Sequence, residues 1–313
     1  MFFKGKKILI TGAAGFIGSN LTDKLLELGA SVIGIDNFFN GNRTNLESAL
    51  KNKNFQFYRG DIRDFNFLLD ISRDIEIIYH QAAFTSVPQS ILMPESCTDI
   101  NIKGTLNILN IARKNDIKKV IFASSSSVYG NISSLPSNEE MERKPISPYG
   151  VTKLTCESYM LVYSQIYGIK TITLRYFNVY GPRQKDSPYS GVIAIWLGNI
   201  KRDEDLIIFG DGNNSRDFTY VKDVVQANIL ASKKDLSGEI FNIGAGSPIT
   251  LTELAKLMLK ISGKENLKIR YTEPRVGDIV NSYADISKAK EFLGFQPKYN
   301  QEEGLKDFFK KFN

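Results

Sequence analysis

Residues 7–18 read KILITGAAGFIG, and this stretch decides the fold of the chain. An apolar run of strand length, 7–11, leads directly into glycines at positions 12, 15 and 18, and a helical pattern follows over 20–29. Glycines at such a junction permit a tight turn, a close approach of the backbone to a pyrophosphate, and packing of the helix on the strand. The spacing is GxxGxxG rather than GxGxxG, and turn glycines are common, so the context matters more than the trio. The stretch predicts a dinucleotide-binding loop.

The next strand supplies that context. Residues 31–36 (SVIGID) form a second apolar run that ends on Asp36, about 20 residues after the glycines, as expected for this motif. A carboxylate at this point hydrogen-bonds a ribose 2′-hydroxyl and repels a 2′-phosphate, so it favours NAD over NADP. The alternative is a plain turn loop with Asp36 as a strand cap.

Further apolar runs alternate with helical patterns along the chain. They cover 7–11, 31–36, 55–61, 75–81, 119–126, 170–178 and 238–244. Short runs that are apolar on both faces and separated by helices indicate a parallel sheet covered on both sides. We therefore predict an α/β fold of the Rossmann type, with a doubly wound parallel sheet.

The alternation weakens after residue 178. The remaining chain mixes helical patterns at 251–261 and 286–294 with a strand pattern at 267–274. We predict a smaller C-terminal α/β substrate lobe. Residues 1–178 plus 219–247 would form the NAD-binding domain, and 179–218 plus 248–313 would form the lobe.

Composition narrows the class of protein. The 313 residues carry a net charge of +6, which suits anionic ligands, but no Lys/Arg-rich block indicates a nucleic-acid partner. Two distant cysteines and a single histidine argue against a disulfide framework and a metal site, so His80 is expected to be a packing residue. No apolar run approaches the length of a membrane span, and the first residues do not resemble a signal peptide. The expected compartment is the cytoplasm.

The segment 147–153 (SPYGVTK) carries a candidate catalytic pair. Ser147 can cap a helix and Pro148 can begin it, which places Tyr149 and Lys153 one turn apart on the same face. An adjacent ammonium, a helix N-terminus and an oxidised nicotinamide would all favour the phenolate form of the tyrosine. Such spacings also arise by chance, but this one follows a strand that ends in the serines at 124–127. A serine hydroxyl there can share the proton of a substrate hydroxyl with Tyr149.

Several motifs together resemble a known family. TGAAGFIGSN (11–20), SSSSVYG (124–130), SPYGVTK (147–153), LRYFNVYGPRQ (174–184) and RVGDIVNSYADISKA (275–289) occur in family order and span nearly the whole chain. The chain resembles the extended short-chain dehydrogenase/reductases that act on nucleotide sugars, and among them most closely the UDP-N-acetylglucosamine 4-epimerases. The resemblance implies NAD as cofactor and a UDP-sugar as substrate.

The resemblance also assigns residues to roles. Tyr149 would be the general base, Lys153 would orient it and the nicotinamide ribose, and Ser125, with Ser126 beside it, would be the catalytic serine. The other cofactor residues would be Gly12, Gly15, Phe16, Ile17, Gly18, Asp36, Asn37, Asn40, Asp61, Ile62, Gln81, Ala82, Ala83, Asn101, Ser124, Tyr176 and Phe177. The UDP-sugar would contact Ser125, Tyr149, Asn178, Gln184, Val192, Phe209, Arg216, Arg275, Asp278 and Ser282, with the two arginines on the diphosphate, which their geometry suits.

The implied reaction is oxidation of the sugar at C4, rotation of the 4-keto sugar in the site, and reduction from the other face. A small side chain at Ser282 would leave room for a 2-acetamido group, so UDP-GlcNAc and UDP-GalNAc are the expected substrates, together with UDP-Glc and UDP-Gal. Sugar dehydration is not expected, because Ser126 and Ser127 stand where dehydratases place an acidic pair. A UDP-glucuronate 4-epimerase or decarboxylase, and a silent NAD-sensing regulator, remain as alternatives.

The family also implies an assembly. The segment 100–113 and the helix that carries Tyr149 resemble the pair of helices that forms a four-helix interface in relatives. We therefore expect a homodimer.

Overall fold

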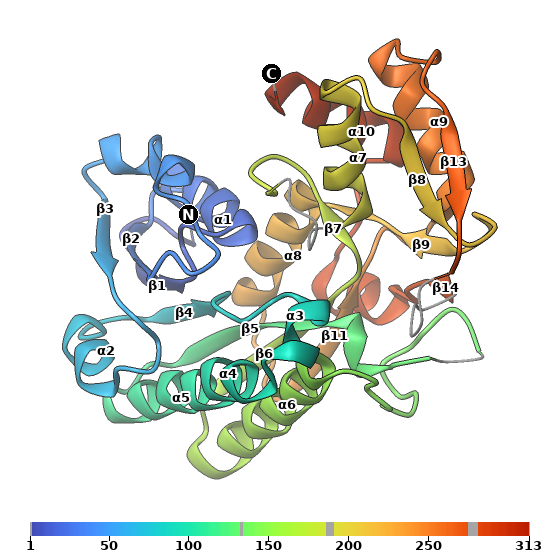
Figure 1. The fold of residues 1–313 in the computed structure, drawn as a ribbon. Helices are drawn as coiled ribbons and strands as arrows, with labels where there is room; N and C mark the ends of the chain where they lie inside the picture. Colours follow the sequence, from blue (N-terminus) through green and yellow to red (C-terminus); the bar gives the residue numbers. More distant parts are fainter. Residues whose placement is uncertain (1, 132–133, 186–190, 275–280, 313) are drawn as a thin grey trace.

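A seven-stranded parallel sheet forms the centre of the computed structural model, which describes residues 2–131, 134–185, 191–274 and 281–312 (Figure 1). In spatial order the strands are β11 (Glu239–Ile243), β6 (Lys170–Tyr176), β5 (Lys119–Ser125), β4 (Ile77–His80), β1 (Lys7–Thr11), β2 (Ser31–Asp36) and β3 (Phe55–Arg59). Each predicted apolar run contains one of these strands, so the predicted doubly wound sheet is confirmed. The chain builds outward in opposite directions from β1 and β4, and ligands of such sheets bind beyond the carboxyl ends of the strands at this point.

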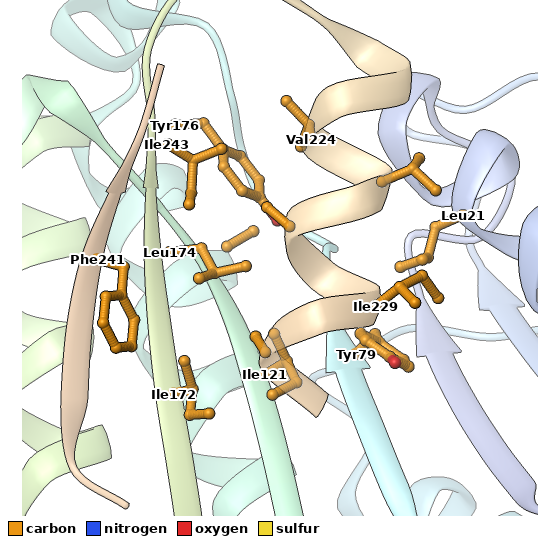
Figure 2. Close-up of a cluster of buried hydrophobic side chains, with 14 of the residues drawn as sticks. Leu21, Tyr79, Ile121, Ile172, Leu174, Tyr176, Val224, Ile229, Phe241 and Ile243 are labelled. Atoms are coloured by element: carbon orange, nitrogen blue, oxygen red, sulfur yellow. The ribbon is translucent and has the colours of Figure 1, made fainter. Parts of the chain in front are cut away.

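Helices cover both faces of the sheet. Helices α1 (Phe16–Glu27) and α8 (Val221–Lys233) lie on one face, and α2 (Phe65–Ile71), α5 (Gly104–Lys114) and α6 (Pro148–Tyr167) lie on the other. Figure 2 shows how α8 lies on the sheet, with Val224 on the side of Tyr176 and Ile243 and Ile229 beside Leu21 and Tyr79. Burial of an aliphatic side chain of this size contributes about 1.5–3 kcal/mol. The sheet is thus held from both sides.

Short helices connect these elements near the carboxyl ends of the strands. α3 (Val87–Leu92) ends at the non-helical Met93, and α4 (Pro94–Thr98) and a π-helix, η3 (Asp99–Lys103), then run without a break into α5. The single turns η1 (Arg43–Leu46) and η2 (Ala49–Lys51) lie between β2 and β3, and η4 (Ser126–Val128) follows β5. Among the described residues, no helix is both long enough and apolar enough to cross a membrane.

The rest of the chain folds into small sheets and helices (Figure 1, upper right). Its paired strands are β7 (Val179–Tyr180) with β10 (Thr219–Tyr220), β8 (Leu206–Phe209) with β13 (Ile269–Thr272), and β9 (Ser215–Asp217) between β12 (Pro248–Thr250) and β14 (Asn281–Ser282). Its helices are α7 (Val192–Lys201), α9 (Leu251–Ser262), α10 (Gln301–Phe312) and the π-helix η5 (Ala289–Leu293). The helix and strand patterns predicted for this part are therefore present.

This part has its own apolar core. Trp196, Leu206, Leu254 and Met258 are buried there, and the indole N–H of Trp196 donates to the carbonyl of Ile207 at 3.1 Å. Tyr220 and Val221 also pack into this core, although the predicted boundaries assigned 219–247 to the cofactor domain. The two parts share residues at their junction, and the exact domain boundaries stay a prediction.

Candidate active site

A cavity of about 750 Å³ runs along the carboxyl ends of the central strands. A second cavity of about 230 Å³ lies in the smaller part, and both are lined by Asn178, Val179, Gln184 and Gly191. Most of the predicted site residues line the larger cavity: Gly12, Gly15, Phe16, Ile17, Gly18, Asp36, Asn37, Asn40, Asp61, Ile62, Gln81, Ala82, Ala83, Ser124, Ser125, Ser126, Tyr149, Lys153, Tyr176, Asn178 and Gln184. The fold therefore brings together residues from the whole length of the sheet domain.

The glycine loop forms one wall of this cavity. Gly12 has φ +69°, and a Cβ at this residue would lie 2.8 Å from the backbone nitrogen of Ala82. A Cβ at Gly18 would lie 2.0 Å from the carbonyl oxygen of Gly12, so only glycine allows this helix to approach the loop. Gly15 caps α1, whose N-terminus therefore opens beside the loop. This backbone cradle fits a pyrophosphate.

Asp36 stands at the end of β2, as predicted. Its carboxylate accepts hydrogen bonds from the backbone N–H groups of Ala14 (3.0 Å) and Phe38 (2.7 Å). Burial raises the pKa of this carboxyl above its usual value, and the backbone donors partly oppose the shift. The side chain is thus fixed at the rim of the cavity, where it can accept a further hydrogen bond from a ribose.

Asp61 is held by its neighbours. Arg63 contacts it through Nε (2.9 Å) and one terminal nitrogen (2.8 Å), and the Asn37 amide donates to it at 2.8 Å. These contacts lower the pKa of Asp61 to about 2. The carboxylate is therefore charged at neutral pH, and with Asn37 it lines the cavity at the end of β3.

Two predicted cofactor residues do not line the cavity. Asn101 is buried in the π-helix, where its amide exchanges hydrogen bonds with the backbone of Phe84 (2.7 and 3.2 Å) and donates to Thr152 (2.9 Å). Phe177 is buried in the core, with its ring 6.2 Å from that of Tyr129. Neither side chain lines the cavity, because each is packed in the interior, and their contact with the cofactor stays a prediction.

The helix of the predicted catalytic pair begins as predicted. The Ser147 hydroxyl accepts a hydrogen bond from the N–H of Gly150 at 3.1 Å, and Pro148 is the first residue of α6. The first turns then carry Tyr149 and Lys153 into the cavity beside the end of β5. The Lys153 ammonium donates to the carbonyl of Ala123 at 2.7 Å, which ties the helix to that strand.

Burial dominates the electrostatics of this pair. It raises the pKa of Tyr149 to about 12, against the effect of a hydrogen bond from Ser125, and it lowers the pKa of Lys153 to about 8. Within the chain alone, burial of the phenol therefore opposes the expected preference for phenolate. Desolvation raises the pKa of Tyr149 more than the hydrogen bond with Ser125 lowers it. A bound cation beside the phenol would shift the balance toward phenolate.

A buried ion pair behind the cavity was not predicted from the sequence. Arg175 on β6 and Glu157 on α6 are almost fully buried and form a two-point contact at 2.9 and 2.7 Å. The same carboxylate accepts from Ser124, and Arg175 also donates to the hydroxyl of Tyr129 at 2.7 Å. The pair therefore ties α6 to β5 and β6. Two features of the sequence could have indicated this pair: an arginine within an apolar strand, and a glutamate one helical turn after Lys153.

The substrate side is less complete. Val192, Phe209 and Arg216 line the second cavity, as predicted, together with Trp196. Ser282 lines neither cavity, but its hydroxyl lies 3.4 Å from the amide nitrogen of Asn178, which lines both. Arg275 and Asp278 lie outside the described residues.

The larger cavity also has lining residues that the sequence did not suggest. Thr85, Ser86 and Gln89 come from the start of α3, and Lys185 comes from the loop after β7. Of these four residues, only Ser86 has a local sequence feature that could have been noticed, since it caps the short helix α3. Within the described ranges, no three His, Cys, Asp or Glu side chains gather as metal ligands would.

Comparisons with known proteins agree with this geometry. Residues 8–244 match the NAD dependent epimerase/dehydratase family. The structure is similar to UDP-glucose 4-epimerase from Thermotoga maritima, solved with UDP-glucose (42% identity, TM-score 0.93, covering 98% of each chain). It is also similar to UDP-N-acetylglucosamine 4-epimerase from Methanobrevibacter ruminantium, solved with UDP-N-acetylmuramic acid (36%, 0.95, 99% of each chain).

A third similar structure is a UDP-glucuronic acid 4-epimerase from Bacillus cereus, in complex with UDP-glucuronic acid and NAD (36% identity, TM-score 0.91). It covers 97% of this chain and 98% of its own. Related proteins thus differ in their sugars while sharing one frame.

Proposed function

The chain belongs to the NAD dependent epimerase/dehydratase family, and on that basis we propose that it is a 4-epimerase that interconverts UDP-GlcNAc and UDP-GalNAc. We propose that it also interconverts UDP-Glc and UDP-Gal. The cofactor of the family is NAD. The arrangement that carries the proposal is the junction of the two cavities at Asn178, with the small Ser282 side chain 3.4 Å from it.

The position of the junction supports a nucleotide sugar as substrate. The larger cavity holds Ser125, Tyr149 and Lys153 beside the glycine loop, and the smaller one is lined by Phe209 and Arg216. A molecule that spans both would place a base against the apolar wall, a diphosphate near the arginine and a sugar near Tyr149. A UDP-sugar has these three parts in this order.

The chain's own residues support acid–base chemistry at the sugar. Tyr149 would take the proton of the 4-hydroxyl, and Ser125 would share that hydrogen bond. Lys153, fixed to the Ala123 carbonyl at 2.7 Å, would hold the phenol and a ribose in register. NAD, when bound, supplies the reversible oxidation at C4. The buried position of Tyr149, which is only 9% exposed, would keep water from the reacting carbon.

The cations of the larger cavity bear on the choice between a neutral sugar and a uronic acid. Among its described lining residues these are Lys153, Arg183 and Lys185. Lys153 is bonded to a backbone carbonyl, and Arg183 pairs with Asp23 on α1 at 2.6 Å. Lys185 is exposed, and its charge acts on the Asp36 carboxylate. Arg183 keeps one buried terminal nitrogen without a hydrogen-bond partner among the residues that the structure describes, so it could contact a C6 carboxylate, and the UDP-glucuronate reactions stay the alternative.

A comparative assay tests the proposal. The purified protein is incubated separately with UDP-GlcNAc, UDP-Glc and UDP-GlcA without added NAD, and the products are separated by chromatography. We expect UDP-GalNAc from the first sugar and UDP-Gal from the second. Conversion of UDP-GlcA alone would establish the uronate alternative. No conversion of any sugar by protein loaded with NAD would favour the regulatory one.

We also propose that the protein is a homodimer that pairs through α6. This helix exposes large apolar side chains, among them Leu161 (40%), Val162 (41%) and Ile166 (67%). Exposed apolar groups clustered along one helix are typical of an interface. Light scattering should give twice the monomer mass. Val162→Glu with Ile166→Glu should give the monomer, and a monomeric wild-type protein at micromolar concentration would contradict the proposal.

A further inference from the structure

His80, the single histidine of the chain, lies at the carboxyl end of β4 and is 1% exposed. It is not a simple packing residue, because both ring nitrogens have polar partners. Nδ1 lies 2.7 Å from the hydroxyl oxygen of Thr11 at the end of β1. Nε2 lies 3.0 Å from the hydroxyl oxygen of Thr105 on α5. The imidazole thus bridges the first strand and a helix on one face of the sheet.

The partners fix which nitrogen carries the hydrogen. The Thr105 hydroxyl oxygen is 2.6 Å from the carbonyl oxygen of Asn101, which can only accept, so the hydroxyl donates there. Its single hydrogen is then used, and it must accept from Nε2–H of His80. Burial lowers the pKa of the imidazole to about 3, with Lys153 the charged group that acts in the same direction, so the ring is neutral. A neutral ring with Nε2–H has a bare Nδ1, which accepts from the Thr11 hydroxyl.

The chain of hydrogen bonds continues beyond both threonines. The Thr11 oxygen accepts the backbone N–H of Ala82 at 3.1 Å, next to the point where Gly12 most closely approaches that backbone. At the other end, Asn101 donates through its amide to the Thr152 hydroxyl at 2.9 Å. Thr152 in turn donates to the carbonyl of Tyr149 at 2.8 Å. Donors and acceptors are matched at every step.

We propose that His80 is a positioning residue whose neutral Nε2–H tautomer couples the backbone of the dinucleotide loop to the helical turn that carries Tyr149. The Asn101 carbonyl is the meeting point of this coupling. It accepts from the backbone N–H of Gly104 and from the Cys156 thiol at 3.4 Å as well as from Thr105, so the π-helix, α5 and α6 meet at one oxygen. Reversal of the tautomer would set Nδ1–H against the Thr11 hydroxyl and leave the lone pair of Nε2 facing the Thr105 oxygen, whose hydrogen is donated to the Asn101 carbonyl. Such a mismatch in a buried network is costly.

The tautomer can be measured without any catalytic assay. In protein labelled with ¹⁵N-histidine, the single residue gives one pair of nitrogen signals, and their couplings to the two ring hydrogens tell Nδ1 from Nε2. We expect a protonated Nε2 and a bare Nδ1, unchanged between neutral pH and pH 5. A protonated Nδ1, or a ring that is charged at neutral pH, would overturn the proposal.

The coupling is tested by hydroxyl replacement. Thr105→Val removes the bridge, and Thr105→Ser retains it. Thr171→Val is the matched control, since Thr171 is equally buried (1%) and also donates to a backbone carbonyl, that of Met160 at 2.9 Å on the amino-terminal side of the sheet. We expect Thr105→Val to retain NAD less tightly than the control and, on the proposed epimerase function, to lower kcat about 10- to 100-fold with KM within about twofold. Thr105→Ser should restore both.

The outcomes separate the two proposals. If the wild type converts no UDP-sugar, the epimerase proposal fails, while the nitrogen spectrum and NAD retention still decide the role of His80. If Thr105→Val matches Thr171→Val in NAD retention and turnover, His80 has no positioning role, whatever its tautomer.

Discussion

The sheet side and the lobe side of the active site are built differently. On the sheet side, Tyr149 and Lys153 lie on a 20-residue helix that is tied to β5 and β6 by buried bonds. On the lobe side, Ser282 and Arg216 lie on strands of two and three residues that pair with each other in register. A reaction common to a family needs the first kind of support, since acid–base groups must be held accurately. A choice among sugars can rest on the second kind, where a single side chain can change without loss of the sheet.

The sharpest test of the sheet side is Tyr149→Phe. The change removes the proton acceptor and little contact area, so kcat should fall about 10²–10⁴-fold with UDP-sugar affinity within a few-fold. Tyr163→Phe is the control, because Tyr163 lies on the same helix, is also 9% exposed, and donates only to Asn110. Steady-state rates and equilibrium binding check both. A variant that kept half of its rate would remove Tyr149 from the mechanism.

The matching test of the lobe side is Ser282→Tyr. A bulky ring next to Asn178 should overpack the sugar site and lower turnover of UDP-GlcNAc and UDP-GalNAc about 10- to 100-fold more than that of UDP-Glc and UDP-Gal. Ser282→Ala, which stays small, should leave the ratio unchanged. The ratio of kcat/KM for the two pairs is the measurement. Equal loss on all four sugars would mean that this strand does not set selectivity.

A third test concerns the cofactor end of the sheet side. The Asp36 carboxylate should make NAD bind about 10- to 100-fold more tightly than NADP, from the bond to a ribose hydroxyl and from repulsion of a 2′-phosphate. Asp36→Asn should reduce the ratio of the affinities for NAD and NADP. Isothermal titration with both dinucleotides gives the ratio, and the melting temperature reports any damage to the Ala14 and Phe38 contacts. Equal affinities in the wild type would disprove the role of Asp36.

The smallest effect should appear in the pH dependence of stability. Burial lowers the pKa of Lys153 to about 8, while in the unfolded chain it is about 10.4. Between these values the unfolded chain binds more protons, so this residue makes the free energy of unfolding rise with pH, by roughly 1–3 kcal/mol. Urea unfolding from pH 7.5 to 10 measures the rise, and Lys153→Met should lack that part of it. If the wild type and Lys153→Met showed the same dependence of the unfolding free energy on pH, Lys153 would be more solvated in the folded protein than its burial indicates.

The sheet side was also the more predictable one. Most strands of the sheet lie in a mainly apolar run, and the cap and proline at 147–148 fix the start of α6, so the strands and the helix of the proposed catalytic pair could be located in advance. Asn101 and Phe177 do not line the cavity, because a sequence motif gives order along the chain but not whether a side chain is packed in the interior. The bridge through His80 depends on contacts 69 and 25 residues apart, beyond any local pattern.

The chain has one tryptophan, and it is not in the sheet. Trp196 is buried in the core of the smaller lobe, bonded to the Ile207 carbonyl, and forms part of the wall of the second cavity. Selectively excited fluorescence therefore reports from this lobe alone. A change in the emission of Trp196 when UDP is added would indicate that the second cavity is occupied. On heating, the shift of this emission to that of a solvent-exposed indole would give the melting temperature of the lobe, separately from that of the sheet.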